Sequence, residues 1–380
     1  MTVRILSCVV GVATVVVIAG CAPAAAPPSS ASPTTVASAM APTTPTPTPT
    51  SASADPTIRV PLQCGNLFTA TTVATLVGVP VTAVVDESTK PADLWEVANV
   101  QRGILTCTWG GKDKTDSGYD QALSIYVEPD GADDFAKNLA YLKTSFTDAQ
   151  TNTFGDESTY GCWSGGGFDC AANVLVGRYW LTVDLHDLAS LHQASKLTVE
   201  SRIKQVLTVV VPALQSAGDA SVPWVAPVGA INSYCTKKNN VVDARKAFGS
   251  PGLSYDSDPA QPFGDVSTIA ESGGDYAMCA WYQLGDTPKG QSSDASVAIL
   301  HGGGWAIPQF VAGPPTQWYV GAYKVVSVSG TTGAVLACNN ADCDAIVGIG
   351  TDAVEIAFSN LGTVRNLTGL TAMVTAITAD

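Results

Sequence analysis

Five consecutive residues near the end of the chain have the types needed to stabilise the charge of an acyl-transfer reaction. They are His301-Gly302-Gly303-Gly304-Trp305, and a run of three glycines leaves the backbone N–H groups open to a substrate oxygen. Backbone N–H groups aimed at a developing oxyanion stabilise the tetrahedral intermediate of ester hydrolysis. Such a loop acts only together with a nucleophile and a base.

The pentapeptide resembles the HGGG oxyanion motif of one group of α/β-hydrolase lipases. Those enzymes place a G-x-S-x-G nucleophile and then a histidine base downstream of the motif. Residues 306–380 contain neither, and His301 is the last histidine of the chain. We therefore predict that this stretch is a loop, that the protein has no catalytic residues and that it is not an enzyme. An esterase-type hydrolase remains the weakest functional alternative.

Three groups of acidic or histidine residues have ligand types for a cation, but none has the spacing of a known metal site. No group extends to a calcium loop with its glycine and distal glutamate, and the cysteines lack Cys-x-x-Cys spacing. We therefore predict no metal and no cofactor, and we interpret the acidic pairs as solvated turns. The groups are His186 and His192 with Asp184 and Asp187, Asp256 with Asp258, and Asp342 with Asp344.

The cysteines recur with nearly the same spacing in two parts of the chain. Cys107 follows Cys64 by 43 residues and Cys279 follows Cys235 by 44, and each later cysteine begins a Cys-x-Trp. An even number of cysteines in an exported chain indicates disulfides. The parallel spacing favours pairing within each repeat, and we expect Trp109 and Trp281 to pack in the two cores. The predicted pairs are Cys64–Cys107, Cys162–Cys170, Cys235–Cys279 and Cys338–Cys343.

The first residues have the layout of a lipoprotein signal peptide. Arg4 supplies the positive start, residues 5–17 form a short apolar run, and Ile18-Ala19-Gly20-Cys21 resembles the bacterial lipobox. An ordinary secretory signal is the alternative, but its cleavage would leave Cys21 as an odd thiol. We predict that residues 1–20 are removed and that Cys21 is lipidated. The protein is then extracytoplasmic, held by lipid on the outer face of the cytoplasmic membrane.

The charge of the chain excludes one class of partner. The formal net charge is −14, and loss of Arg4 with the signal peptide makes it −15. Such a chain is repelled by phosphate backbones, so we expect no nucleic-acid partner.

Residues 21–57 are rich in Pro, Thr, Ser and Ala and predict a disordered tether. The remaining chain divides into two expected domains, 58–218 and 224–380.

The elements that position these residues recur in the same order in both domains. Apolar periodicity predicts helices at 66–79 and 241–248, and closing helices at 199–214 and 367–377. Residues 135–146 predict a further helix, whose place in the second domain is taken by the Gly- and Pro-rich stretch 301–317. We predict an α+β fold with two tandem homologous domains, each a mostly antiparallel sheet with covering helices. Residues 174–185 predict a hairpin or one long strand that Gly177 interrupts. The other predicted strands are 105–109, 123–127, 278–281, 297–300, 325–328 and 354–358.

Several short motifs resemble a known family. The chain resembles the secreted domain of actinobacterial cell-envelope lipoproteins of unknown function at three places: Cys64-Gly-Asn-Leu-Phe-Thr, residues 73–78 and the Cys-x-Trp at Cys107. The secreted domain of those lipoproteins is similar to the extracellular sensor domains of mycobacterial receptor Ser/Thr kinases. The resemblance implies a disulfide-linked α+β fold with a ligand-binding cleft. The chain departs from the pattern at Ala70, where a proline is common, and at Lys238, where a leucine is usual.

The leading hypothesis for function is a non-catalytic ligand-binding or sensor-like module of the cell envelope. Its ligand is an unidentified small molecule, lipid, glycan or protein. Trp305, Trp318 and Tyr319 have no counterparts in the first domain and are the predicted contact surface. The alternative is a structural or accessory protein that docks another envelope protein.

Overall fold

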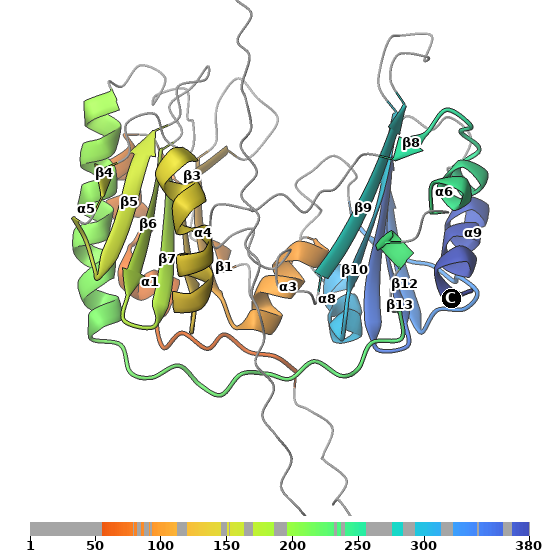
Figure 1. Ribbon diagram of the computed structural model, residues 1–380, viewed down its shortest axis with the longest axis horizontal. Helices are drawn as coiled ribbons and strands as arrows, with labels where there is room; N and C mark the ends of the chain where they lie inside the picture. The colour runs from red at the N-terminus through yellow and green to blue at the C-terminus, as the bar shows by residue number, and fades with distance from the viewer. Residues whose placement is uncertain are drawn as a thin grey trace, which may run out of the picture. The chain divides into compact units, whose positions relative to one another are not determined.

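The computed structural model of the protein (Figure 1) has one compact unit, Ala52–Asp380, that holds all of the described residues. The predicted signal peptide, Cys21 and residues 22–54 of the predicted tether lie outside the described part. No helix of the described part is long and apolar enough to cross a membrane. The structure describes residues 55–78, 80–81, 85–86, 91, 93–111, 120–145, 150–151, 153–162, 170–185, 196–231, 234–236, 240–255, 276–283, 293–312, 322–339, 342–359 and 367–379.

Two antiparallel sheets organise this unit, and each has seven strands among the described residues. The first has the order β1-β2-β3-β7-β6-β5-β4. Gly177, at φ 58°, turns the β6–β7 hairpin, because glycine adopts a positive φ without a steric penalty. The strands are β1 (Val85–Asp86), β2 (Leu105–Gly111), β3 (Asp120–Glu128), β4 (Gln150–Thr151), β5 (Glu157–Cys162), β6 (Cys170–Val176) and β7 (Tyr179–Leu185).

The second sheet repeats the first strand by strand. Its order is β8-β9-β10-β14-β13-β12-β11 when written from the equivalent edge. Gly350, at φ 61°, turns the β13–β14 hairpin as Gly177 turns its counterpart. The α+β class with two equivalent sheets is therefore confirmed. The strands are β8 (Ser254–Tyr255), β9 (Tyr276–Gln283), β10 (Ser293–Leu300), β11 (Lys324–Val325), β12 (Gly333–Cys338), β13 (Asp342–Ile349) and β14 (Asp352–Ser359).

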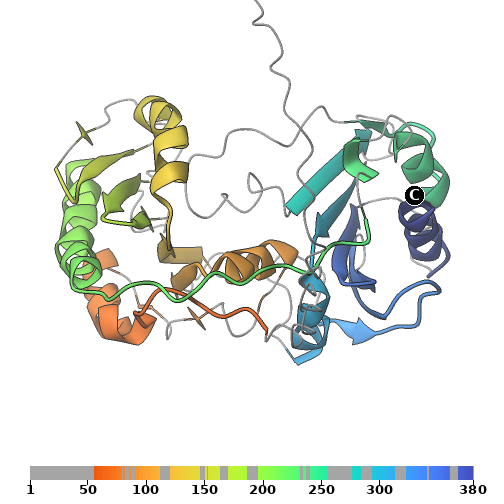
Figure 2. The same ribbon diagram turned by 60° about the horizontal axis from the view of Figure 1, so that its bottom comes forward.

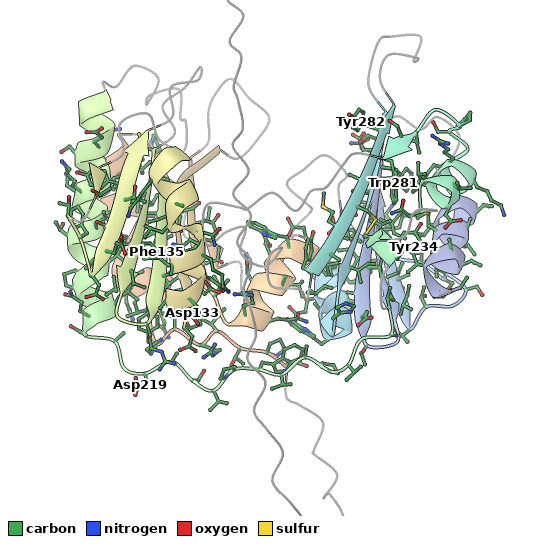
Figure 3. The ribbon with its side chains drawn as sticks, in the orientation of Figure 1. Asp133, Phe135, Asp219, Tyr234, Trp281 and Tyr282 are labelled. Carbon is green, nitrogen blue, oxygen red and sulfur yellow. A yellow bond between two sulfur atoms is a disulfide. The ribbon has the colours of Figure 1, made fainter. Side chains whose placement is uncertain are left out.

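Helices cover both faces of the first sheet (Figure 1). The main core lies under α1 (Cys64–Leu67), α2 (Ala70–Val77) and α5 (Lys196–Gln215) and includes the fully buried Trp109. On the other face, α4 (Ala132–Ser145) packs Phe135 edge-on against Trp180, with ring centroids 5.9 Å apart (Figure 3). The single helix predicted at 66–79 is two helices, because Thr69 caps α2 by accepting from the N–H of Thr72.

The second sheet has a different arrangement on one face. Its main core lies under η2 (Tyr234–Thr236), α6 (Asn240–Phe248) and α9 (Leu367–Thr378), and Trp281 and Tyr234 are buried there (Figure 3). The opposite face is covered by η4 (Gly303–Ala306) and α8 (Ile307–Ala312). The prediction of a loop over 301–305 was therefore wrong for residues 303–305, which belong to η4. In the Gly- and Pro-rich stretch 301–317, residues 303–312 form short helices in the place that α4 occupies in the first half.

A helix that the sequence did not predict completes this face. Helix α3 (Leu94–Arg102) precedes β2 in the chain, yet Leu94, Val97 and Ala98 pack in one cluster with Ala298 and Leu300 of β10. Asp93 caps its first turn by accepting from the N–H of Glu96 at 2.8 Å, and Gly103 ends it at φ 78°. The first half of the chain thus contributes to a core of the second sheet, while the predicted boundaries 58–218 and 224–380 stay predictions.

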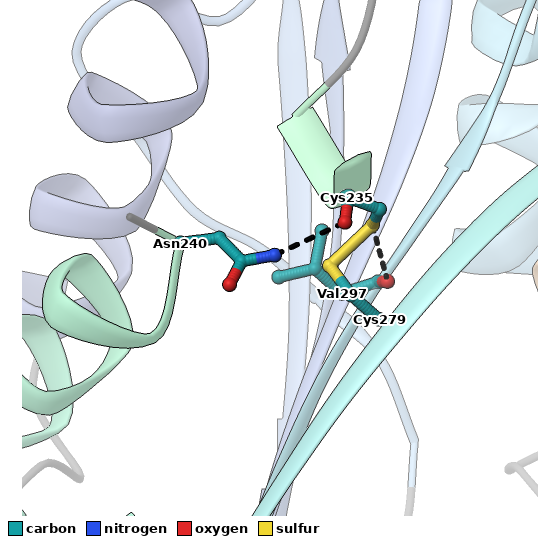
Figure 4. The surroundings of a disulfide bond; sticks show 4 residues. All are labelled: Cys235, Asn240, Cys279 and Val297. Carbon is teal, nitrogen blue, oxygen red and sulfur yellow. Dashed lines mark hydrogen bonds between the residues drawn. A yellow bond between two sulfur atoms is a disulfide. The ribbon is translucent and has the colours of Figure 1, made fainter. Parts of the chain in front are cut away.

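The disulfides follow the predicted pairing where the structure describes both sulfurs. Cys64–Cys107, Cys235–Cys279 and Cys338–Cys343 are bonded. Cys170 is also disulfide-bonded, and its register partner across β5 and β6 is Cys162. Figure 4 shows one bond in its surroundings: Asn240 donates to the carbonyl of Cys235 at 3.2 Å, which ties α6 to the disulfide.

Candidate functional site

A cavity of about 270 Å³ lies beside the C-terminal half of α3 and is the candidate ligand site. Its wall is built by α3, the turn between β3 and α4, the extended segment after α5, and the paired ends of β9 and β10 at Tyr276 and Leu300. Small-molecule pockets commonly measure about 300–1,000 Å³, so this cavity suits a small ligand.

One face of α3 supplies the floor of the cavity. Ala98, Gln101 and Arg102 all line it, and their spacing of three and four residues places them on the same side of a helix. Gln101 is only 7% exposed, and neither its amide oxygen nor its amide nitrogen has a hydrogen-bond partner among the described residues. A buried polar group left unpaired costs about 1–3 kcal/mol, so such groups call for a partner. Both amide atoms are enclosed by protein and are not open to the cavity, so they destabilise the fold without marking a ligand contact.

Arg102 is held at the wall by two carboxylates. Its Nη2 donates to Oε1 of Glu128 and, at 2.8 Å, to Oδ2 of Asp134. Burial opposes the charge of Arg102, but the two carboxylates outweigh it and raise the pKa of the guanidinium. Burial also raises the pKa of Glu128, although Arg102 acts in the opposite direction. The guanidinium is therefore fixed in position and its charge is balanced within the wall.

Asp130 organises a second group of charges at the turn before α4. It accepts from Nη2 of Arg59 and from Nε of Arg178, the latter at 2.6 Å. Burial acts to raise the pKa of Asp130, but the two arginines outweigh it and lower that pKa. Asp130 has a φ of 60°, a left-handed conformation that Asp adopts more readily than most residues. Strained backbone of this kind recurs at binding sites.

The segment that joins α5 to the second sheet runs past the cavity without helix or strand (Figure 2). Pro223, Trp224 and Ala226 line the cavity. Valines on the same segment recur every third residue and are at least 77% exposed, which matches the three-residue turn of an extended polyproline helix. These are Val222, Val225 and Val228, called the valine row below.

Asp352 anchors the end of this segment. Its carboxylate is fully buried and accepts from the N–H groups of Ala230 at 2.8 Å, Ile231 at 2.9 Å and Gly302 at 3.0 Å. The N–H of Gly304 donates to the carbonyl of Thr351 at 2.9 Å. Two of the three glycine N–H groups of the 301–305 stretch are therefore engaged by Thr351 and Asp352 at the β13–β14 turn, and the same carboxylate of Asp352 holds the joining segment. They are not directed toward a substrate oxygen.

The glycines of this loop are explained by close packing. A Cβ added at Gly302 would lie 2.8 Å from Cδ of Pro227, and Gly302 has a φ of 70°. A Cβ at Gly229 would lie 2.3 Å from Nδ1 of His301. Nδ1 of His301 in turn lies 3.4 Å from Oδ2 of Asp352. The His301–Trp305 motif is thus the surface on which the joining segment packs.

A cluster of carboxyl groups lies where α3 meets the second sheet. Asp344 was interpreted as part of a solvated turn, but it lies in β13 and is only 9% exposed. Burial raises its pKa to about 6, although the hydroxyl of Tyr323 donates to it. Burial and the neighbouring carboxylates raise the pKa of Glu355 well above its usual value, and burial raises that of Asp93. Within the described ranges, no group of acidic, histidine or cysteine side chains is arranged to hold a metal.

Of the three residues predicted to form a contact surface, the structure describes Trp305, which is not one of the cavity-lining residues. Trp305 is partly buried and packs against the cluster formed by α3, α8 and the second sheet. Trp318 and Tyr319 lie outside the described residues, as do His186, His192, Asp187, Asp256 and Asp258. Sequence reasoning missed Gln101, although the signals for α3 were present: an Asp followed three residues later by Glu, and Gly103 after the last turn.

Comparison with known proteins adds no assignment. No protein-family model and no curated protein matches the chain. A search of solved structures returned the crystal structure of DynU16, a protein of the dynemicin biosynthetic locus, at 8% identity and a TM-score of 0.12. That alignment covers 78% of this chain and 93% of the other, and a score this low carries no argument about fold or function.

Proposed function

We propose that the protein is an extracytoplasmic lipoprotein, anchored through Cys21, whose cavity beside α3 binds a small molecule without transforming it. The observation that carries the binding proposal is the cavity itself, where the aromatic side chains of Trp224 and Tyr276 line the same space as Arg102. A small number of polar groups in a pocket fixes the orientation of a small ligand. The signal-peptide layout and the lipobox cysteine support the anchor.

The non-catalytic part of the proposal rests on how the polar groups are used. The guanidinium and carboxylate groups at the cavity wall are engaged with one another, which suits a rigid binding surface. The glycine loop that could have formed an oxyanion hole donates its N–H groups to Asp352 and Thr351 instead. Both features favour holding a ligand over reacting with it.

The full-length lipoprotein, purified from the membranes of its host in detergent, provides the test. Native mass spectrometry should detect a small molecule that co-purifies with the wild-type protein. Trp224→Ala removes an aromatic ring that lines the cavity, and it should lose that molecule. Val222→Ala is the matched control, because Val222 lies on the same segment and is 87% exposed but is not one of the cavity-lining residues. A wild-type protein with no bound molecule, and no thermal shift from an extract of host envelope, would contradict the proposal.

A second candidate function is docking to another envelope protein, and the valine row favours it. Three valines exposed along one edge of an extended segment present apolar area to solvent, and an extended chain of this type is a common recognition element. Replacing all three by serine should abolish crosslinking of that segment to one defined envelope protein while the cavity ligand is retained. Unchanged crosslinking would exclude the valine row as a docking surface.

A further inference from the structure

We propose that a groove between α2 and α5 is a second ligand site, and that it binds an organic oxyanion, a carboxylate or a phosphate monoester, through Arg202. The groove has a volume of about 860 Å³ and shares no lining residue with the cavity beside α3. Pockets that hold small organic molecules commonly measure about 300–1,000 Å³. This site is separate from the binding function proposed above and stands or falls independently of it.

One face of each helix lines the groove with neutral polar groups. On α5, Ser201, Gln205 and Val209 lie on one side of the helix, because they are spaced four residues apart. On α2, Thr72 and Thr75 face the groove. Hydroxyl and amide groups donate hydrogen bonds to an oxyanion without bringing a charge of their own. The groove can therefore surround an anion with donors.

Arg202 supplies the charge of the groove. Its Nη1 donates to the carbonyl of Val77 at 3.2 Å. Its Nε and Nη2 have no hydrogen-bond partner among the described residues, and neither atom is enclosed by protein, so both stay accessible at the groove. Burial lowers the pKa of Arg202, and no carboxylate of the described part offsets this effect. A partly buried cation without a counter-ion favours an anion at its side.

The other described arginines of the first half show what Arg202 lacks. Arg59 and Arg178 pair with Asp130, and Arg102 pairs with Glu128. The chain has a formal net charge of −14, so carboxylates are abundant in it. None belongs to the residues that line this groove. The groove therefore complements an anion, although most of the chain repels one.

The second half shows the same pair of helices without such a separation. Helices α6 and α9 lie side by side in the equivalent places and contact each other closely (Figure 1). Val241 of α6 and Ala372 and Ala376 of α9 pack against the core there. Helices α2 and α5 contact each other only marginally, and Val209 of α5 is 42% exposed. The open groove is thus a property of the first half that the shared fold does not require.

The apolar part of the lining indicates that the anion carries an organic body. Phe68, Leu76 and Val209 line the groove together with the polar groups. Inorganic phosphate would leave this apolar area exposed to water, whereas a short alkyl chain would cover it. A molecule with an oxyanion at one end and an apolar chain at the other therefore uses both parts of the lining.

The test is calorimetric titration of the full-length lipoprotein in a maltoside detergent at low salt. Hexanoate and hexyl phosphate are the anionic probes, and hexanamide and hexylamine are the neutral and cationic probes of similar length. We expect at least one anion to bind with a Kd in the millimolar range, as suits a ligand of about eight non-hydrogen atoms, and at least tenfold more tightly than hexanamide. Raising the salt concentration to about 0.5 M should weaken the anion, because salt screens accessible charges. The stronger of the two anions shows which oxyanion the groove prefers.

Variants separate this groove from other basic sites and from the cavity. Arg202→Gln should weaken the bound anion about tenfold or more, the loss of a charged hydrogen bond. Gln205→Glu places a carboxylate beside the guanidinium and should abolish binding. Arg245→Gln is the matched control, because Arg245 also donates to a backbone carbonyl, that of Leu253 at 2.6 Å, but does not line the groove. Trp224→Ala should leave the Kd of the anion unchanged, since Trp224 lines only the cavity.

Three results would each overturn the oxyanion site. They are binding of neither anion, equal affinity for hexanoate and hexanamide, and an anion affinity that Arg202→Gln leaves unchanged. None of them affects the cavity beside α3, whose ligand is measured by its co-purification and its loss in Trp224→Ala.

Discussion

The backbone N–H of Leu94 donates to Oε2 of Glu355 at 3.1 Å, although the two residues are 261 positions apart in the chain. This bond places the first turn of α3 on strand β14 of the second sheet. A helix N-terminus carries partial positive charge and unpaired N–H groups, so it stabilises a nearby carboxylate. The contact ties the two halves together at the point where three carboxyl groups gather.

The carboxyl cluster should make stability depend on pH. The pKa of Asp344 is raised from 3.8 to about 6 in the folded protein, so between these values the folded state binds more protons than the unfolded one. Its contribution to stability is then present below about pH 4 and is lost as the pH rises through about 6. Each unit of such a shift corresponds to about 1.4 kcal/mol.

Asp344→Asn removes this titration, and we expect the variant to gain stability relative to wild type between pH 4 and 7. Urea unfolding at pH 4.5 and 7.5 measures the difference in the free energy of unfolding. Asp219→Asn is the control, because the side chain of Asp219 is 95% exposed and should show no comparable difference (Figure 3). A wild type and Asp344→Asn variant with the same pH profile would exclude the cluster as the source.

Much of the architecture was predictable because it depends on local pattern. The Cys-x-Trp repeats, the apolar alternation of the strands and the hairpin glycines Gly177 and Gly350 are all visible in the sequence, and the structure confirms two equivalent sheets. Helix α3 was missed because only its outer turns carry signals, at Asp93 and Gly103, and its apolar face packs on a strand far away in sequence.

The candidate site was harder to predict because its residues, like the contacts of α3, come together from distant parts of the sequence. Gln101, Asp130, Trp224 and Tyr276 come from four separate segments, and no spacing rule relates them. The motif that drew attention, His301–Trp305, has its glycines for close packing, Gly302 against the joining segment and the other two against the second sheet and its β13–β14 turn. A pattern of residue types showed that this loop was unusual, but only the partners of its N–H groups showed why.

Asp352→Ala should be among the most destabilising substitutions in the chain. It removes a fully buried acceptor and leaves the N–H groups of Ala230, Ile231 and Gly302 without their partner. The loss should be roughly 3–5 kcal/mol, since unpaired buried donors each cost about 1–3 kcal/mol and the costs are not additive. Chemical denaturation measures it, with the exposed Asp219→Ala expected within about 0.5 kcal/mol of wild type. A small effect of Asp352→Ala would mean that water replaces the carboxylate.

Loss of the Cys235–Cys279 bond should weaken the second sheet in particular. The bond closes 44 residues and joins η2 to β9 beneath α6 (Figure 4). In the chain-entropy account, a disulfide that closes a loop of that length stabilises the folded state by about 4 kcal/mol. The double variant Cys235→Ala/Cys279→Ala should therefore lose about that much, and hydrogen exchange should rise first in α6 and β9. If exchange rose equally in both sheets, the two halves would unfold as one unit.

Anchoring should depend on one side chain. Cys21 is the predicted acceptor of the diacylglyceryl group, because it follows the lipobox-like Ile18-Ala19-Gly20. Cys21→Ala, expressed in the host, should move the protein from the detergent phase to the aqueous phase on phase separation. Cys8→Ala is the control, because Cys8 belongs to the segment that we expect to be removed. A Cys21→Ala protein that still enters the detergent phase would contradict lipid anchoring at that residue.

Gly302 separates the packing role of the glycine loop from an enzymatic one. Gly302→Ala places a Cβ 2.8 Å from Pro227 and 3.1 Å from Trp224 at a φ of 70°, so both strain and overpacking act on the joining segment. We expect a loss of about 2–4 kcal/mol, of which about 1 kcal/mol comes from the left-handed backbone alone. Gly177→Ala isolates that share, because Gly177 has a φ of 58° but no atom within 4 Å of an added Cβ. The difference between the two variants in urea unfolding therefore measures the contact with Pro227 and Trp224.

Hydrolysis of p-nitrophenyl acetate, measured on the same proteins, should stay at the background rate in wild type and in both variants. Turnover by the wild type that Gly302→Ala abolishes without loss of stability would refute the packing role and restore the esterase alternative.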